Sequence, residues 1–204
     1  MAKAKKPAGK PARRGGVPAR RSAPNDAIAL LKADHRQVEN WFEQFDSSRS
    51  DSRKEELAQK ICQALQVHTQ IEAEIFYPAF LQATQEEDIH HEAEVEHAGA
   101  KKLIAEIEST GADDDHFDAR VRVLSEMIKH HVKEEEKRDG MFAKARQSDM
   151  DLGEIGERLA SRKQELMGSE DNSDDGDTAR GPRGSAGGRK QEAALTRAAR
   201  RFGS

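Results

Sequence analysis

Two histidine–glutamate pairs occur in the sequence at the same spacing. His68 is followed four residues later by Glu72, and His131 is followed four residues later by Glu135. On an α-helix, residues i and i+4 project from one face about one turn apart, so both side chains of a pair can reach the same ion. A buried glutamate beside a buried histidine is costly unless another group compensates both. The two pairs therefore indicate a metal site.

Two further histidines extend the pattern. His35 and His97 lie 62 residues apart and each directly follows an acidic residue, while the two His–Glu pairs repeat at an offset of 63. This doubling predicts a pseudo-twofold site in which each half offers two histidines and one carboxylate. Six such groups suit two metal ions better than one, with the glutamates able to bridge. The candidate metal ligands are His35, His68, Glu72, His97, His131 and Glu135.

The donor types narrow the choice of metal. Imidazole and carboxylate without thiolate fit iron, manganese or zinc, and open coordination positions favour iron redox chemistry. Structural zinc normally has a closed four-ligand site, usually with cysteine, whereas Cys62 is the single cysteine here. A ferritin-like carboxylate site needs Glu-x-x-His on two helices, and one such match is present, from Glu94 to His97. We therefore expect two non-haem iron ions, with manganese or zinc as alternatives that fit less well.

The segments that carry these residues have helical periodicity. Between residues 26 and 168, apolar residues recur at steps of three and four, and no sustained alternation indicates a strand. Asn25 or Asp26 is placed to cap a first helix that runs through Phe45, and Pro78 is expected to kink or begin to end the second. Further helices are expected at about 53–83, 86–109, 114–147 and 151–167. Because the loops are short, we predict an all-α, up-down-up-down four-helix bundle with a short C-terminal fifth helix and disordered tails.

The charge pattern divides the chain into three parts. Residues 1–25 carry eight basic and no acidic side chains among many Ala, Pro and Gly. Residues 169–204 form a tail that is acidic first and basic at its end. Neither segment has the apolar content to offset its ordering entropy, so both are expected to be disordered. Residues 26–168, with a net charge of −13, form the expected metal-binding domain.

Several classes of protein are excluded by composition. No stretch approaches the roughly 18 consecutive apolar residues that a membrane-spanning helix needs. A single cysteine permits no disulfide framework within the chain and fits a reducing compartment. No apolar run of the kind found in export signals follows the paired arginines near the start, so a cytoplasmic location is expected. The basic arm at residues 1–25 leaves weak nucleic-acid contact open as an alternative.

The combined motifs resemble the hemerythrin-like HHE cation-binding family over about residues 26–147. The resemblance is carried by Asp34-His35, by His68-x3-Glu72 leading into Phe76-Tyr77-Pro78, by Glu96-His97 and by His130-His131-x3-Glu135. It implies that the six candidate ligands bind two irons, with Glu72 and Glu135 bridging. It also implies a di-iron centre that binds O2 or a related small ligand such as nitric oxide or peroxide. Members of this family are linked to oxygen carriage or sensing, iron handling and oxidative-stress responses.

One position departs from the oxygen-carrying members of the family. Those proteins have a His-x3-His pair in the third helix, whereas the residues four positions from His97 are Ala93 and Lys101. This difference argues against simple O2 carriage and favours sensing, peroxide chemistry or iron storage. A further hypothesis is an enzyme that uses the same centre. The alternative is a DNA- or protein-interaction module whose tails bind and whose bundle is a scaffold.

The remaining polar residues near the motifs are expected to have lesser roles. His130 lies about 100° round the helix from His131, so we expect it at the surface or behind the ligands. His90 could be a ligand because it lies seven residues before His97, whereas His91 and His116 are expected to be solvated. For Asp34 and Glu96 two interpretations are open. Each could orient a neighbouring metal ligand without binding the metal itself, or it could lie on an exposed face of its helix. The Glu134–Glu136 run is expected to be solvated except for Glu135.

Overall fold

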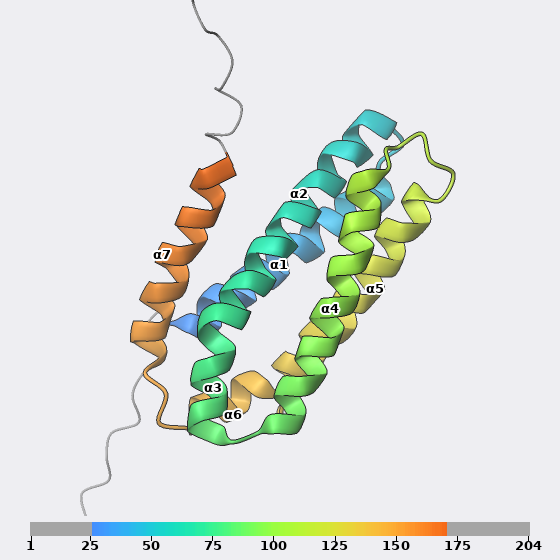
Figure 1. Ribbon diagram of the computed structural model, residues 1–204. Helices are drawn as coiled ribbons and strands as arrows, with labels where there is room; N and C mark the ends of the chain where they lie inside the picture. The colour runs from blue at the N-terminus through green and yellow to red at the C-terminus, as the bar shows by residue number, and fades with distance from the viewer. Residues whose placement is uncertain (1–25, 171–204) are drawn as a thin grey trace, which may run out of the picture.

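The computed structural model describes residues 26–170, which form helices joined by short loops and contain no strand (Figure 1). The helices are α1 (Ala27–Ser47), α2 (Asp51–Ile71), the π-helix η1 (Glu72–Phe76), α3 (Tyr77–Thr84), α4 (Glu87–Ser109), α5 (Phe117–Glu136), α6 (Met141–Gln147) and α7 (Leu152–Glu170). The expectations for residues 1–25 and 171–204, namely disorder and nucleic-acid contact, lie outside the described residues.

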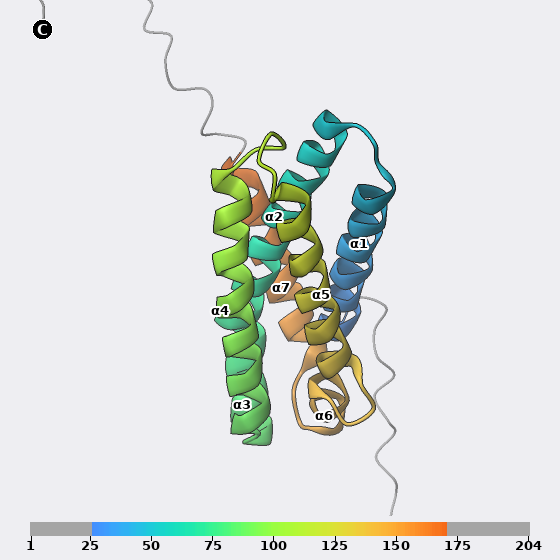
Figure 2. The same cartoon turned by 90° about the vertical axis from the view of Figure 1, so that its right-hand side faces the viewer.

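Four long rods form the bundle: α1, α2 continued by η1 and α3, α4, and α5. Consecutive rods run in opposite directions, and each rod contacts two others (Figures 1 and 2). Capping residues start the first two rods: Asp26 accepts a hydrogen bond from the N–H of Ala29 at 2.8 Å, and Ser50 accepts one from the N–H of Arg53 at 3.3 Å. The expected four-helix bundle is confirmed. The expected fifth helix is α7, which packs along α1 and α2.

The second rod widens to a π-helix in its middle. The N–H of Tyr77 bonds to the carbonyl of Glu72, five residues earlier. Pro78 follows immediately, and a proline both lacks an N–H and crowds the carbonyl four residues before it. A locally widened turn relieves that crowding, so the helix continues to Thr84. Pro78 therefore does not end the rod.

The helix expected at about 114–147 is not continuous. It ends as α5 at Glu136, and the chain turns through residues 137–140 before α6 begins at Met141. Gly140 packs against the last turn of α5: a Cβ atom added there would lie 2.2 Å from the carbonyl oxygen of Glu134 and 2.7 Å from that of Glu135. Only glycine permits this close approach. Apolar residues continue at helical spacing past the break, which is why periodicity predicted a single helix.

The apolar core consists of two clusters that are separated along the bundle. One cluster, which includes Phe42, Leu65 and Ile104, lies toward the α1–α2 and α4–α5 connections. The other, which includes Leu31 and Phe76, joins the opposite end of the bundle to α6 and α7. In α1 and α4 the candidate ligand falls between residues of these two clusters, and in the other two rods the candidate ligands lie where one cluster gives way to the other. The core therefore encloses a polar layer in the middle of the bundle.

Within the described residues, no helix is long and apolar enough to cross a membrane. The cytoplasmic location and the domain boundary at residue 168 stay predictions.

Candidate metal centre

Six buried histidine and glutamate side chains converge in the polar layer between the two apolar clusters. Each of them is at most 5% exposed to solvent. Helix α1 supplies one, α2 and η1 together supply two, α4 supplies one and α5 supplies two. The residues are His35, His68, Glu72, His97, His131 and Glu135. The structure thus brings together every side chain that the sequence analysis singled out as a candidate ligand.

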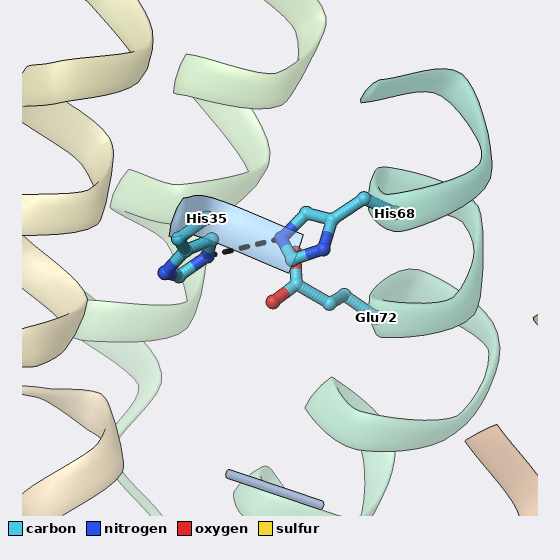
Figure 3. A group of neighbouring side chains, drawn as sticks. All are labelled: His35, His68 and Glu72. Atoms are coloured by element: carbon cyan, nitrogen blue, oxygen red, sulfur yellow. Dashed lines mark hydrogen bonds and ion pairs between the residues drawn. The ribbon is translucent and has the colours of Figure 1, made fainter. Parts of the chain in front are cut away.

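The four imidazole rings meet in two pairs. The Nε2 atoms of His35 and His68 lie 3.1 Å apart (Figure 3), and the Nε2 atoms of His97 and His131 lie 3.2 Å apart. One pair joins α1 to α2, and the other joins α4 to α5. This arrangement matches the doubling of the sequence. All four Nε2 atoms point toward the shared centre.

Each glutamate lies between one histidine of each pair. Glu72 Oε2 is 3.3 Å from His68 Nε2 and 3.4 Å from His97 Nε2. Glu135 Oε2 is 3.5 Å from His35 Nε2 and 3.6 Å from His131 Nε2. Two trios of potential ligand atoms result, His35–His68–Glu72 and Glu72–His97–His131, and they share Glu72. The geometry offers two neighbouring positions for a cation with carboxylates between them.

The charged form is disfavoured in five of these six groups. His131 is the exception: burial lowers its pKa, but the charges of Glu135 and Glu96 outweigh this effect and raise it. Burial lowers the pKa of His35 and His68, and it lowers the pKa of His97 to about 2. Burial also raises the pKa of Glu72 and Glu135. Among the described residues, one oxygen of each of these glutamates, Glu72 Oε1 and Glu135 Oε2, has no hydrogen-bond partner. Unpaired buried oxygens beside neutral imidazoles fit a multiply charged cation, which would compensate them.

Carboxylates stand behind three of the four histidines. The Nδ1 atom of His35 is 2.9 Å from Glu136, and that of His131 is 2.7 Å from Glu96. Asp34 lies 3.6 Å from the Nδ1 atom of His68. A carboxylate at Nδ1 holds the proton on that nitrogen and leaves the Nε2 lone pair free to bind a metal. For Glu96 the structure therefore favours the orienting interpretation. Asp34 is partly buried beside His68 and not on an exposed flank, but at 3.6 Å it makes no hydrogen bond to that ring.

Glu136 is a residue of the site that sequence reasoning missed. Besides His35, it contacts Lys32 at 2.9 Å and Arg36 at 2.7 Å. Partial burial raises its pKa, but the hydrogen bonds to His35 and Lys32 dominate and lower it to about 2. Glu136 is therefore ionised at neutral pH and is not a freely solvated residue. The signal available in the sequence was the pair of basic residues near His35 on the facing helix.

Tyr77 is a second residue whose part in the site was missed. Its hydroxyl lies 3.2 Å from His97 Nε2 and donates toward Glu72 Oε2 at 3.4 Å and Glu135 Oε1 at 3.3 Å. Its ring stacks on His97 with the centroids 5.4 Å apart. Burial raises its pKa well above the ordinary value, so the phenol keeps its proton. Tyr77 thus places a neutral hydroxyl among the six converging groups.

A small cavity adjoins the four histidines on their apolar side. Its other walls are dominated by aliphatic side chains, including Val38, Leu65, Ile128 and Val132. The cavity volume is about 10 Å³, which is close to the minimum for one water molecule. An apolar wall on one side of a polar cluster favours a small uncharged occupant.

The remaining histidines lie outside the centre. His130 is 60% exposed and lies 3.3 Å from Glu96, as expected for a position behind the ligands. His90 is mostly buried, but it packs edge-on against the ring of Tyr77 and does not reach the six groups. His91 and His116 are both exposed, as expected.

A four-helix bundle with a buried cluster of histidines and carboxylates defines a class of helical cation-binding proteins. A sequence model of the hemerythrin HHE cation binding domain matches residues 26–143, more than half of the chain, so the chain belongs to this family. A hemerythrin HHE cation binding domain-containing protein from Mycobacterium kansasii has a similar crystal structure. It is 24% identical, with a TM-score of 0.59 over 71% of this chain and 88% of that one. No curated protein gives a significant match.

Proposed function

We propose that this chain is a non-haem di-iron protein that binds O2, or a related small ligand such as nitric oxide or peroxide, at the centre of its bundle. The observation that carries the proposal is the pair of His/Glu trios that share Glu72. In this arrangement His35 and His68 would hold one ion, and His97 and His131 the other. Glu72 and Glu135 would bridge the two ions, since each lies between one histidine of each pair.

Iron is the metal that the donors suit best. Four imidazoles and two carboxylates without a thiolate are borderline to hard ligands, which suit iron, manganese and zinc. Six groups shared by two ions leave open positions at each ion, and a structural zinc site would be closed by four ligands. Bound iron would supply redox chemistry and open positions for a small ligand. Manganese or zinc would also bind to these donors, but the open coordination positions would then have less chemical use.

The surrounding residues would control what reaches the two ions. Val38, Leu65, Ile128 and Val132 exclude water from one side of the histidines, which favours small uncharged molecules. On another side, Tyr77 holds a proton within hydrogen-bond distance of Glu72, Glu135 and His97. A neutral phenol can donate a hydrogen bond to a partly charged ligand without itself ionising.

The biological role that fits best is sensing, iron handling or protection from oxidative stress. Ala93 and Lys101 stand where a further histidine would complete one ion's ligands, and the nearby phenol adds a protic group. Both features argue against reversible O2 carriage alone. Peroxidase-like or ferroxidase activity would use the same centre, and turnover with added peroxide or ferrous iron would distinguish an enzyme from a binding protein.

Metal analysis of anaerobically purified protein tests the proposal. We expect two irons per chain and visible absorption that changes when air is admitted. Glu72→Ala/Glu135→Ala should lose both irons together, whereas the exposed control Glu126→Ala should keep them. A well-folded bundle that takes up no iron would refute the di-iron centre and direct attention to residues 1–25 as a nucleic-acid-binding segment.

A further inference from the structure

A second group of potential cation ligands lies outside the buried cluster. Glu92 and Glu96 on α4 and His130 on α5 place one ligand atom each within 4.8 Å of one another. Glu96 Oε1 is 3.3 Å from His130 Nε2, while its other oxygen contacts the core histidine His131. Glu96 therefore connects the exposed group directly to the buried cluster.

A cavity runs from Glu92 and Glu96 of this group to the buried Glu135, and His130 lies next to it through its contact with Glu96. Its walls include exposed Glu92, partly buried Glu96 and Glu134, and finally Glu135, which is 2% exposed. Glu135 Oε2 is one of the buried oxygens without a hydrogen-bond partner among the described residues. The cavity thus runs from acidic side chains in solvent to a buried carboxylate with one oxygen that accepts no hydrogen bond from the described residues.

The charge around Glu96 differs from that around the other carboxylates behind the histidines. Glu136 is paired with Lys32 and Arg36, and Asp34 is paired with Lys163. Within the described part of the chain, no lysine or arginine pairs with Glu96. Cations thus offset the charge of two of the three carboxylates behind the histidines, whereas no lysine or arginine among the described residues offsets that of Glu96. The cavity beside Glu96 is lined by four glutamates and one lysine, Lys137, which is paired with Glu134.

We propose that Glu92, Glu96 and His130 form an entrance site that binds a divalent cation on its way to the buried centre. The inference rests on the proposed function, because it assumes that the centre takes up metal. The cavity has a volume of about 20 Å³, which is enough for about one water molecule. A cation with its complete hydration shell is therefore too large to pass. Carboxylate and imidazole groups at the mouth replace part of that shell before the ion enters.

The first experiment measures the rate at which apo-protein takes up ferrous iron under anaerobic conditions. Glu92→Gln/His130→Gln removes one charge and one imidazole at the mouth while leaving Glu96 on His131. We expect uptake roughly threefold to tenfold slower, since local acidic charge raises the encounter rate of cations. The final content should stay at two irons per chain. The wild-type rate should also fall more steeply with ionic strength than that of the variant.

Another cluster on the same helix provides the matched control. His91 and Glu94 form a potential ligand group with His90. Neither of them lines the cavity, as Glu92 does, or pairs with Glu96, as His130 does. Glu94→Gln/His91→Gln makes the same chemical changes on α4 and should leave the uptake rate unchanged. Equal rates for wild type and the Glu92/His130 variant would overturn the proposal. So would a slower rate in the control alone.

A second experiment separates this proposal from the di-iron proposal. In a Glu72→Gln/Glu135→Gln background, titration with Mn²⁺ followed by electron paramagnetic resonance should detect one weakly bound ion. That ion should be lost when Glu92→Gln/His130→Gln is added. If wild type fails to load two irons but this manganese site is present, the di-iron proposal fails and the surface site stands. If Glu92→Gln/His130→Gln does not change manganese binding, the entrance site is refuted, whichever metal the buried centre binds.

Discussion

Replacing the two buried glutamates by glutamines should stabilise the metal-free chain and abolish its stabilisation by iron. Glu72 and Glu135 are fully enclosed, and burial raises the pKa of both carboxyl groups. Without a cation they must either bind protons or stay ionised with poor compensation. Glutamine has nearly the same shape and carries no charge, so Glu72→Gln/Glu135→Gln removes this cost. It also removes both carboxylates that we propose as bridging groups, so a metal ion should no longer stabilise the fold through them.

The size of the effect follows from the unpaired oxygens. Glu72 Oε1 and Glu135 Oε2 have no hydrogen-bond partner within the described structure, and a buried unsatisfied group costs about 1–3 kcal/mol. Because a buried amide also needs partners, we take the lower limit of about 1 kcal/mol for each position. The sum of about 2 kcal/mol corresponds to a melting temperature about 4–8 °C higher for a domain of this size.

Thermal unfolding at pH 7, followed by circular dichroism, provides the assay. Wild type and variant are compared after removal of metal with a chelator and again with excess ferrous iron under anaerobic conditions. Iron at a hundred times its dissociation constant should stabilise wild type by about 2.7 kcal/mol, and it should leave the variant unchanged. Glu56→Gln/Glu126→Gln, which changes two exposed glutamates, controls for the loss of charge.

Two results would refute this reasoning. A metal-free variant that melts below wild type would show that the buried carboxylates stabilise the apo-protein through contacts that the glutamines cannot replace. A variant that iron stabilises as much as wild type would show that the metal binds elsewhere. In either case the link between uncompensated burial and cation binding would fail.

Three further predictions concern positions around the centre. Gly140→Ala should lower the free energy of unfolding in urea by about 1–3 kcal/mol, because the added Cβ would meet the carbonyl oxygen of Glu134; a loss below about 0.5 kcal/mol would contradict the close approach. Burial raises the pKa of Cys62 to about 12, so at pH 8 iodoacetamide should label the native thiol at least about a hundred times more slowly than the unfolded one. Glu136 has a pKa lowered from 4.5 to about 2, so it stabilises the fold above pH 4.5 and this contribution disappears as the pH falls toward 2. Glu136→Gln should therefore flatten the acid limb of the curve of stability against pH, and an unchanged limb would argue against its bond to His35.

Much of the fold and the centre could be predicted because both depend on residues that share one helix face. His68 and Glu72 lie four apart, as do His131 and Glu135, and the apolar residues around them keep the same period. The bundle and the converging side chains follow from this spacing. The end of α5 could not be predicted in this way, because it depends on the packing of Gly140 against the helix and not on periodicity.

The two missed residues of the site have a common explanation. Glu136 lies about 100° from Glu135 on α5, so the apolar stripe places it on the solvated face. Its contacts with His35 depend on how closely α1 approaches, which spacing within one helix does not reveal. Tyr77 comes five residues after Glu72, and an ordinary α-helix would turn it about 140° away. The π-helix removes most of that angle, and no sequence rule applied here predicts a π-turn.

The π-helix also determines which change in chain length the centre tolerates. Deleting Ala73 would allow the widened turn to become an ordinary α-helical turn. Tyr77 would then follow Glu72 by four residues, which places the two side chains about 40° apart on one helix face. The phenol would therefore stay beside Glu72 although the chain is one residue shorter. When related sequences are compared, a one-residue gap at this turn would be compatible with an unchanged set of site residues.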